Sequence, residues 1–244
     1  MSKQACKNSN KMLDVLIAES WDRNVNVRAE DIEKKTDYTY HKVILPWVLN
    51  KVSRYTSHDS RILDIGCGCG YLTNEVFETG RRAIQGIDLS YASVEYASRK
   101  YPEICFKNQN VYDLENCGDL DACLAIMLLN NIPEIDGFFK RMAQILKPGG
   151  YLLACIPHPC FWPHKHILEN SFRYDIIEKY IIPFSTKGRK DYRSPVPYFH
   201  RPLEVYVASI QDAGFSFVDF EELVEGEMDK NPDILSLVLR KEAI

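Results

Sequence analysis

The chain has 244 residues, of which 45% are hydrophobic and 26% are charged, as is usual for a soluble globular protein. Its net charge of −4 argues against a broad nucleic-acid-binding face. Every apolar run is shorter than a membrane span, and the first residues carry no signal-peptide core, so we expect a cytoplasmic protein. Eight cysteines without any C-x-x-C pair disfavour a disulfide framework or a zinc site.

Residues 1–58 precede the first predicted strand. Apolar residues at helical spacing predict helices over 11–21 and 42–51, and because Pro46 lies within the second pattern, that helix can instead begin at Pro46 itself. Between them lies a polar segment that ends in Tyr38, Tyr40 and His41. These three side chains are candidates for the roof of a substrate pocket, with core or surface packing as the alternative.

Strands and helices alternate from residue 61 to residue 157. Strands are predicted at 61–65, 83–88, 104–107, 121–126 and 151–156, and helices at 71–79, 90–100 and 134–146. Such alternation with short connections predicts a parallel sheet with helices on both faces. A helix at 202–213 and strands at 215–221 and 234–240 complete the chain.

Residues 158–201 interrupt this alternation with nine aromatic residues and four histidines. Such a segment can bury surface, so we expect an ordered binding loop or lid. His158 follows the fifth predicted strand, and His200 and Arg201 precede the next helix. We consider the two histidines as catalytic candidates and Arg201 as a substrate ligand, with structural contacts to the backbone as the alternative. We expect no metal site.

The segment 61–73 reads RILDIGCGCGYLT and runs from a buried strand through a glycine-rich loop into a helix. Alternate glycines allow a sharp turn and the close approach of a ligand. Asp88 ends the next strand, about 20 residues further on, where a carboxylate is placed to bind a ribose. The dinucleotide fingerprint is G-x-G-x-x-G, whereas the spacing here is G-x-G-x-G. Asp64, two residues before the first glycine, suits an ammonium or sulfonium better than two phosphates.

The motifs DIGCGCG and GIDLS resemble the first two motifs of the class I (Rossmann-like) S-adenosylmethionine-dependent methyltransferases, of the bacterial small-molecule type. LKPGGYLLACIP resembles the segment that leads into the fifth strand of that family. The resemblance implies a Rossmann-like three-layer α/β/α sandwich, with a mostly parallel seven-stranded sheet and an antiparallel last strand. It also implies that residues 1–58 cover the cofactor and that 59–244 form the methyltransferase domain, with 158–201 as the acceptor lid.

The same resemblance implies the residues that bind the cofactor. Asp64 would orient its methionine end and Asp88 its ribose, while Asn110 would reach the adenine amino group, or Asp113 if the strand is shifted. The full predicted set is Asp64, Gly66, Cys67, Gly68, Tyr71, Asp88, Leu89, Asn110, Val111, Ala125 and Met127.

The activity implied is methyl transfer from S-adenosylmethionine, with S-adenosylhomocysteine as product and with general-base assistance. No N/D-P-P-Y motif follows the fourth predicted strand, which disfavours DNA-base and protein-glutamine methylation. The expected acceptor is an oxygen or nitrogen of a small molecule or short peptide, and the expected protein is a monomer or homodimer without nucleic-acid or membrane partners. The open alternatives are a nicotinamide-dependent oxidoreductase, an RNA methyltransferase that uses 158–201, and a non-catalytic cofactor-binding partner protein.

Overall fold

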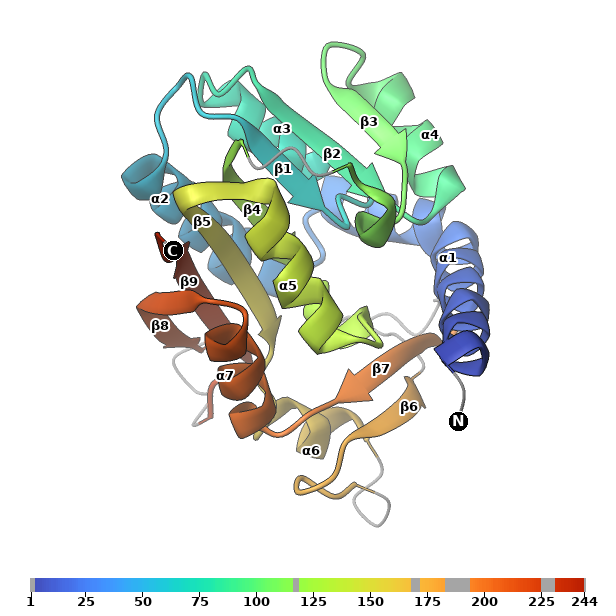
Figure 1. Ribbon diagram of the computed structural model, residues 1–244. Coiled ribbons are helices and arrows are strands. Elements are labelled where there is room, and N and C mark those ends of the chain that lie inside the picture. Colours follow the sequence, from blue (N-terminus) through green and yellow to red (C-terminus); the bar gives the residue numbers. More distant parts are fainter. Residues whose placement is uncertain (1–2, 116–118, 168–171, 183–193, 225–230, 244) are drawn as a thin grey trace.

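The computed structural model describes residues 3–115, 119–167, 172–182, 194–224 and 231–243. Its centre is a seven-stranded sheet with the order β3-β2-β1-β4-β5-β9-β8 (Figure 1). The strands are β1 (Ile62–Ile65), β2 (Ile84–Asp88), β3 (Cys105–Asn108), β4 (Leu120–Ile126), β5 (Leu146–Pro157), β8 (Phe215–Leu223) and β9 (Ile234–Lys241). Strands β1 to β5 pair in parallel, whereas β9 runs antiparallel to its neighbours β5 and β8. The predicted mostly parallel sheet with an antiparallel last strand is confirmed.

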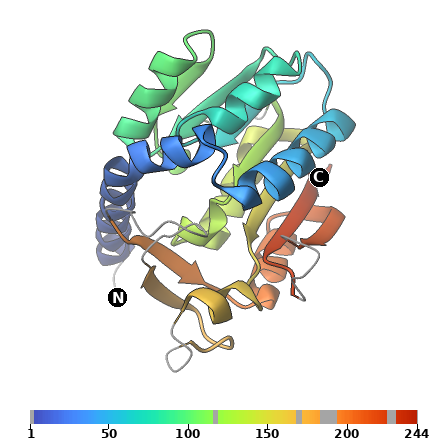
Figure 2. The same cartoon turned by 180° about the vertical axis from the view of Figure 1, so that it is seen from behind.

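Helices cover both faces of the sheet, and strand β4 shows why its sequence is apolar throughout. Ala122 and Leu124 pack in the core beneath α2 (Leu45–Tyr55) and α3 (Tyr71–Glu78). Cys123 and Ala125 pack in the core beneath α5 (Ile135–Ile145) and α7 (Leu203–Asp212). Successive side chains of a strand point to opposite faces, so a strand buried on both sides is apolar at every position. Figures 1 and 2 show the two helical layers on opposite sides of the sheet.

The order of the strands reverses beside β1. From there β2 and β3 extend the sheet in one direction and β4 and β5 extend it in the other. Open α/β sheets form a crevice outside the carboxyl ends of the strands at such a switch point. The loop 66–70 after β1 and the short helix η3 (Leu129–Asn131) after β4 both lie at these ends.

The N-terminal residues form one helix, α1 (Lys3–Glu33), followed by a π-helical turn, η1 (Tyr40–Ile44), that leads into α2. The helix predicted over 11–21 is therefore the middle part of a longer one. Helix α1 lies beside the loop 66–70 (Figures 1 and 2), where the Sγ of Cys69 donates to the carbonyl of Val25 at 3.6 Å. Asp22 fixes α1 to α4 (Tyr91–Lys100) by accepting hydrogen bonds from Ser90 Oγ at 2.6 Å and from the N–H of Ala92 at 3.0 Å.

The aromatic segment contributes α6 (Trp162–His166) and a hairpin of β6 (Glu178–Ile182) and β7 (Val196–His200). Trp162 stacks on Tyr198 with ring centroids 4.9 Å apart, so the aromatic residues pack into a small core of their own. The hairpin is joined to η3 by Asn131, whose Nδ2 donates to the carbonyl of Pro197 at 2.5 Å. Within the described residues, no helix has both the length and the apolar character needed to cross a bilayer.

Candidate functional site

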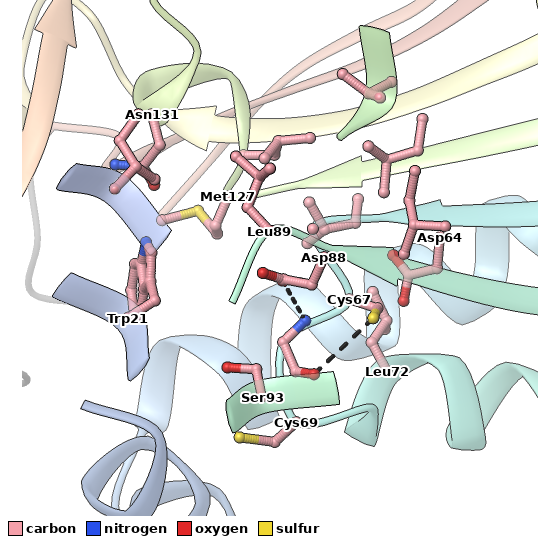
Figure 3. A pocket seen from close by; sticks show the side chains of 18 of the residues that line it. Trp21, Asp64, Cys67, Cys69, Leu72, Asp88, Leu89, Ser93, Met127 and Asn131 are labelled. Carbon is pink, nitrogen blue, oxygen red and sulfur yellow. Dashed lines mark hydrogen bonds between the residues drawn. The ribbon is translucent and has the colours of Figure 1, made fainter. Parts of the chain in front are cut away.

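A cavity that is partly open to solvent lies at the carboxyl ends of β1, β2 and β4, and its empty space together with the adjoining open solvent amounts to about 1340 Å³. Its floor is the loop 66–70 together with Asp88 at the end of β2 (Figure 3). Its other walls come from the loops after β3 and β4, from η1, and from one face of α1. Segments far apart in the sequence therefore meet around one space.

The glycine loop brings its backbone close to this cavity. Gly66 and Gly68 have φ values of 73° and 53°, in the left-handed region that favours glycine. A Cβ at Gly66 would lie 2.8 Å from Cδ1 of Leu128, whereas a Cβ at Gly68 would meet no atom within 4 Å. The backbone at Gly68 thus faces open space that a ligand can occupy.

Asp88 is held in place by the same loop. Its Oδ2 accepts a hydrogen bond from the N–H of Gly68 at 2.8 Å (Figure 3), and its Oδ1 accepts one from the N–H of Ser90 at 2.8 Å. Burial raises the pKa of Asp88, and these two backbone hydrogen bonds oppose the rise. Each oxygen of an ionised carboxylate accepts about two hydrogen bonds, so Asp88 can still bind two donors from a ligand.

Asp64 lies deeper, at 1% exposure, and its Oδ2 accepts a hydrogen bond from Oγ1 of Thr73 at 2.7 Å. Burial raises the pKa of Asp64 to about 7, the hydrogen bond from Thr73 lowers it, and the charge of Asp88 raises it further. The side chain therefore changes charge near neutral pH, and a cation beside it would favour the ionised form.

Helix α1 supplies residues that sequence reasoning missed. Asp14, Trp21 and Arg28 line the cavity at intervals of seven residues, with Ile17 and Val25 between them. This spacing of three and four is the signal that marks one face of a helix. The Nδ2 of Asn110 donates to Oδ2 of Asp14 at 2.9 Å, so α1 also touches the loop after β3.

Ten of the eleven predicted cofactor residues line the cavity. The exception is Ala125, which has no exposed surface and lies in the core on the α5 side of β4. Its neighbour Ile126 lines the cavity instead, because side chains alternate along a strand. Among the described residues, no group of three or more metal-binding side chains is found.

The two predicted catalytic histidines lie outside the cavity. His158 is 1% exposed, and its Nδ1 accepts a hydrogen bond from the N–H of Cys160 at 3.2 Å. The proton of the neutral ring is then on Nε2, which lies 2.8 Å from Oε1 of Glu222. His200 is fully buried, and its Nε2 lies 3.0 Å from the carbonyl of Tyr174. Both side chains thus make structural contacts rather than facing the site.

Arg201 also serves the fold rather than the cavity. It is 2% exposed, and its guanidinium donates to the carbonyls of Leu129 at 3.3 Å, Pro133 at 2.9 Å and Ile132. These three carbonyls belong to the loop after β4 that borders the cavity. The alternative reading of Arg201 as a structural cap is the one that the geometry supports.

The three predicted roof residues separate. Tyr38 is 50% exposed, and His41 contacts the backbone, with its Nε2 2.9 Å from the carbonyl of Ile32. Neither Tyr38 nor His41 lines the cavity. Tyr40 does line it. The side chains at 38 and 40 diverge because residues 38–44 are helical, and residues two positions apart on a helix point to different sides.

Comparison with known proteins agrees with this geometry. Residues 62–150 match the family described as a methyltransferase domain. A demethylmenaquinone methyltransferase of Tropheryma whipplei is 37% identical over 106 residues, which are 40% of this chain and 42% of that protein. A ubiquinone biosynthesis O-methyltransferase of Xanthomonas axonopodis is 28% identical over 167 residues, 66% of this chain and 64% of the relative. The chain thus matches less than two thirds of the length of these relatives.

Solved structures share the fold across most of the chain. An S-adenosylmethionine-dependent methyltransferase of Methanosarcina mazei superposes with a TM-score of 0.66 at 19% identity, covering 80% of this chain and 98% of the other. At that identity the likeness concerns the fold. The matched domain over residues 62–150, the strand order and the glycine loop with Asp88 confirm the resemblance to the class I (Rossmann-like) S-adenosylmethionine-dependent methyltransferases.

Proposed function

We propose that the chain binds S-adenosylmethionine in this cavity and transfers its methyl group to an oxygen or nitrogen of a small, largely apolar molecule. The observation that carries the proposal is the charge of the cavity wall. Three aspartates, Asp14, Asp64 and Asp88, line it together with Arg28, which is itself paired with Asp37. An excess of carboxylates favours a cationic ligand and disfavours the pyrophosphate of a dinucleotide.

The residues present fit this cofactor. The open space at Gly68 admits a ligand against the loop, and Asp88 retains acceptor capacity for two ribose hydroxyls. Leu89 and Val111 offer apolar surface for the adenine, and Asp64 offers a carboxylate for the ammonium. When bound, the cofactor would supply a methyl group on a positively charged sulfur. The sulfur would become a neutral thioether when the methyl group passes to the acceptor.

The part of the cavity away from Asp64 suits an apolar acceptor. Trp21, Met127 and Asn131 lie together on the far side of Asp88 from Asp64 (Figure 3), and Ile132, next to Asn131 in the sequence, also lines the cavity. The relatives named above include two enzymes of quinone methylation, which supports a small-molecule acceptor for this chain. An in-line displacement depends mainly on the alignment of the two reactants and on the exclusion of water. We therefore assign these walls the task of positioning the acceptor.

Calorimetric titration with S-adenosylmethionine and NAD tests the cofactor. The wild-type chain is expected to bind the former and not the latter. Asp88→Ala removes charge-assisted hydrogen bonds of about 1.5–3 kcal/mol and should weaken binding at least about tenfold. The exposed Asp59→Ala is the matched control and should leave the affinity within about twofold. Binding of NAD, or an unchanged affinity in Asp88→Ala, would contradict the proposal.

The acceptor class is tested by the formation of S-adenosylhomocysteine in the presence of different acceptors. Phenols and nitrogen heterocycles are expected to support turnover. RNA is not expected to do so, because the acidic cavity repels phosphates. Turnover with RNA but with none of the small molecules would contradict this acceptor class.

A further inference from the structure

Tyr40 carries a polar atom that the fold leaves unused. The residue is 6% exposed, and its hydroxyl oxygen is buried without a hydrogen-bond partner among the described residues. Buried hydroxyls in proteins are nearly always paired, because an unpaired one is unfavourable. Tyr40 lines the cavity, so a molecule bound there can supply the missing partner. Burial raises the pKa of Tyr40, so the hydroxyl remains a hydrogen-bond donor at physiological pH.

Arg28 lies beside the ring of Tyr40 in the same cavity wall. Its guanidinium carbon lies 5.7 Å from the centroid of the Tyr40 ring, and both residues line the cavity. Asp37 holds the two in a fixed relation, since its Oδ2 accepts from Nη1 of Arg28 and its Oδ1 accepts from the N–H of Tyr40 at 2.9 Å. The guanidinium of Arg28 and the backbone of Tyr40 are thereby held in place before any ligand arrives.

Asp64 provides the opposite charge nearby. Asp64 lines the same cavity from β1. Burial is the main cause of the raised pKa of Tyr40, and the carboxylate of Asp64 adds to it while the guanidinium of Arg28 lowers it. The cavity wall therefore combines two donors from the N-terminal segment with one carboxylate from β1. A zwitterion with a carboxylate and an ammonium on the same carbon is complementary to such a wall.

We propose that Arg28, Tyr40 and Asp64 form the subsite for the α-amino-acid end of the cofactor. Arg28 and Tyr40 donate to its carboxylate, and Asp64 accepts from its ammonium. This inference rests on the proposed function, and it assigns Tyr40 to the cofactor instead of the methyl acceptor. Two of the three residues lie outside the matched methyltransferase domain of residues 62–150, so the N-terminal segment decides whether a carboxylate is required.

The test uses two ligands that differ only in this carboxylate. They are S-adenosylhomocysteine and its decarboxylated analogue, S-(5′-adenosyl)-3-thiopropylamine, titrated calorimetrically into the full chain. The wild-type protein should bind S-adenosylhomocysteine at least about tenfold more tightly than the analogue. Tyr40→Phe and Arg28→Met should each weaken the binding of S-adenosylhomocysteine by about tenfold or more and leave the analogue within about twofold.

Two exposed side chains serve as matched controls. Tyr91→Phe, at 64% exposure, and Arg23→Met, whose side chain is 58% exposed on α1, should leave both affinities unchanged. Arg28→Met also leaves Asp37 without its cationic partner, so Arg28→Lys provides a second variant that keeps the charge. Arg28→Lys should lose part of the preference for the carboxylate, because an ammonium lacks the planar fork of a guanidinium.

Unfolding of the unliganded variants separates a ligand role from a packing role. Tyr40→Phe removes a hydroxyl without a partner, so its thermal midpoint should equal or exceed that of the wild type while its affinity falls. A lower midpoint with unchanged affinity would assign the hydroxyl to the fold and overturn the proposal. Equal binding of the two ligands by the wild type would overturn it while leaving the cofactor assignment intact. Binding of neither ligand would overturn the cofactor assignment itself.

Discussion

The buried carboxyl of Asp64 gives a pH dependence whose sign and size follow from its surroundings. Its pKa is raised from 3.8 to about 7 in the folded protein, mainly by burial. Between these values the folded chain binds a proton that the unfolded chain has lost, so stability falls as pH rises. A full pH unit in this window costs about 1.36 kcal/mol, but at pH 7 the folded-state carboxyl is still half protonated, so the loss between pH 5 and pH 7 is about 2.3 kcal/mol. The loss levels off near pH 8, where the carboxyl is ionised in both states.

Asp64→Asn removes this titration and keeps an oxygen that can accept the hydrogen bond from Thr73. Urea unfolding of both proteins at pH 5, 6, 7 and 8 gives the difference in their free energies of unfolding. That difference should shift in favour of Asp64→Asn by about 2.3 kcal/mol between pH 5 and pH 7, and by less than about 0.5 kcal/mol more between pH 7 and pH 8. Titrations common to both proteins cancel in the difference. A difference independent of pH would mean that Asp64 is ionised throughout in the folded protein, which would refute the reasoning.

Three further substitutions test the roles assigned to single residues. His158→Ala should destabilise the chain by about 2 kcal/mol in urea unfolding, through loss of its contacts with Glu222 and Cys160. Its affinity for S-adenosylhomocysteine should remain within about twofold of the wild type. A large loss of affinity would mean that His158 does contribute to the binding site. Arg201→Ala should cost about 3–5 kcal/mol in the same assay, because carbonyls lose a buried cationic donor; a cost below about 1 kcal/mol would contradict the role as a clamp. Gly68→Ala should fold with a penalty of about 1–2 kcal/mol for its left-handed backbone. Its affinity for S-adenosylhomocysteine in calorimetry should fall at least about tenfold, and an unchanged affinity would mean that the ligand does not approach this loop.

The core of the fold and the floor of the cavity were accessible from the sequence for a physical reason. A strand buried on both faces is a short apolar run, and the turn after it needs glycine. The structure of residues 62–70 can therefore be predicted from their local sequence. Asp88 could be placed because β2 pairs in parallel with β1, which brings the two strand ends together. Local signals of this kind are strongest where backbone geometry restricts the residue type.

The cavity wall formed by α1 gave a weaker signal. The face of α1 that lines the cavity carries Asp14 and Arg28 among apolar residues. In sequence, this mixture is typical of a solvent-exposed helix face and not of a buried one. The position of the Arg28 guanidinium depends on its ion pair with Asp37. Asp37 lies beyond the end of α1 and contacts Arg28 only in the folded chain. Contacts between separate elements of this kind are not encoded in the spacing of a single segment.

The two histidines show a different limit. His158 does follow β5 at the end of the sheet where ligands bind, as predicted, but its side chain is directed toward Glu222 on β8. His200 ends β7 and contacts Tyr174, a residue 26 positions earlier. The position of a residue along a strand can be inferred from sequence, whereas the direction of its side chain depends on partners that the sequence does not identify.

The most direct test of the account is a crystal structure of the chain grown with S-adenosylhomocysteine. Electron density is expected in the cavity above Gly68, with the ribose hydroxyls at Asp88 and the amino-acid end beside Arg28, Tyr40 and Asp64. Density for the ligand outside this cavity, or a cavity that stays empty at saturating ligand, would contradict the central claim.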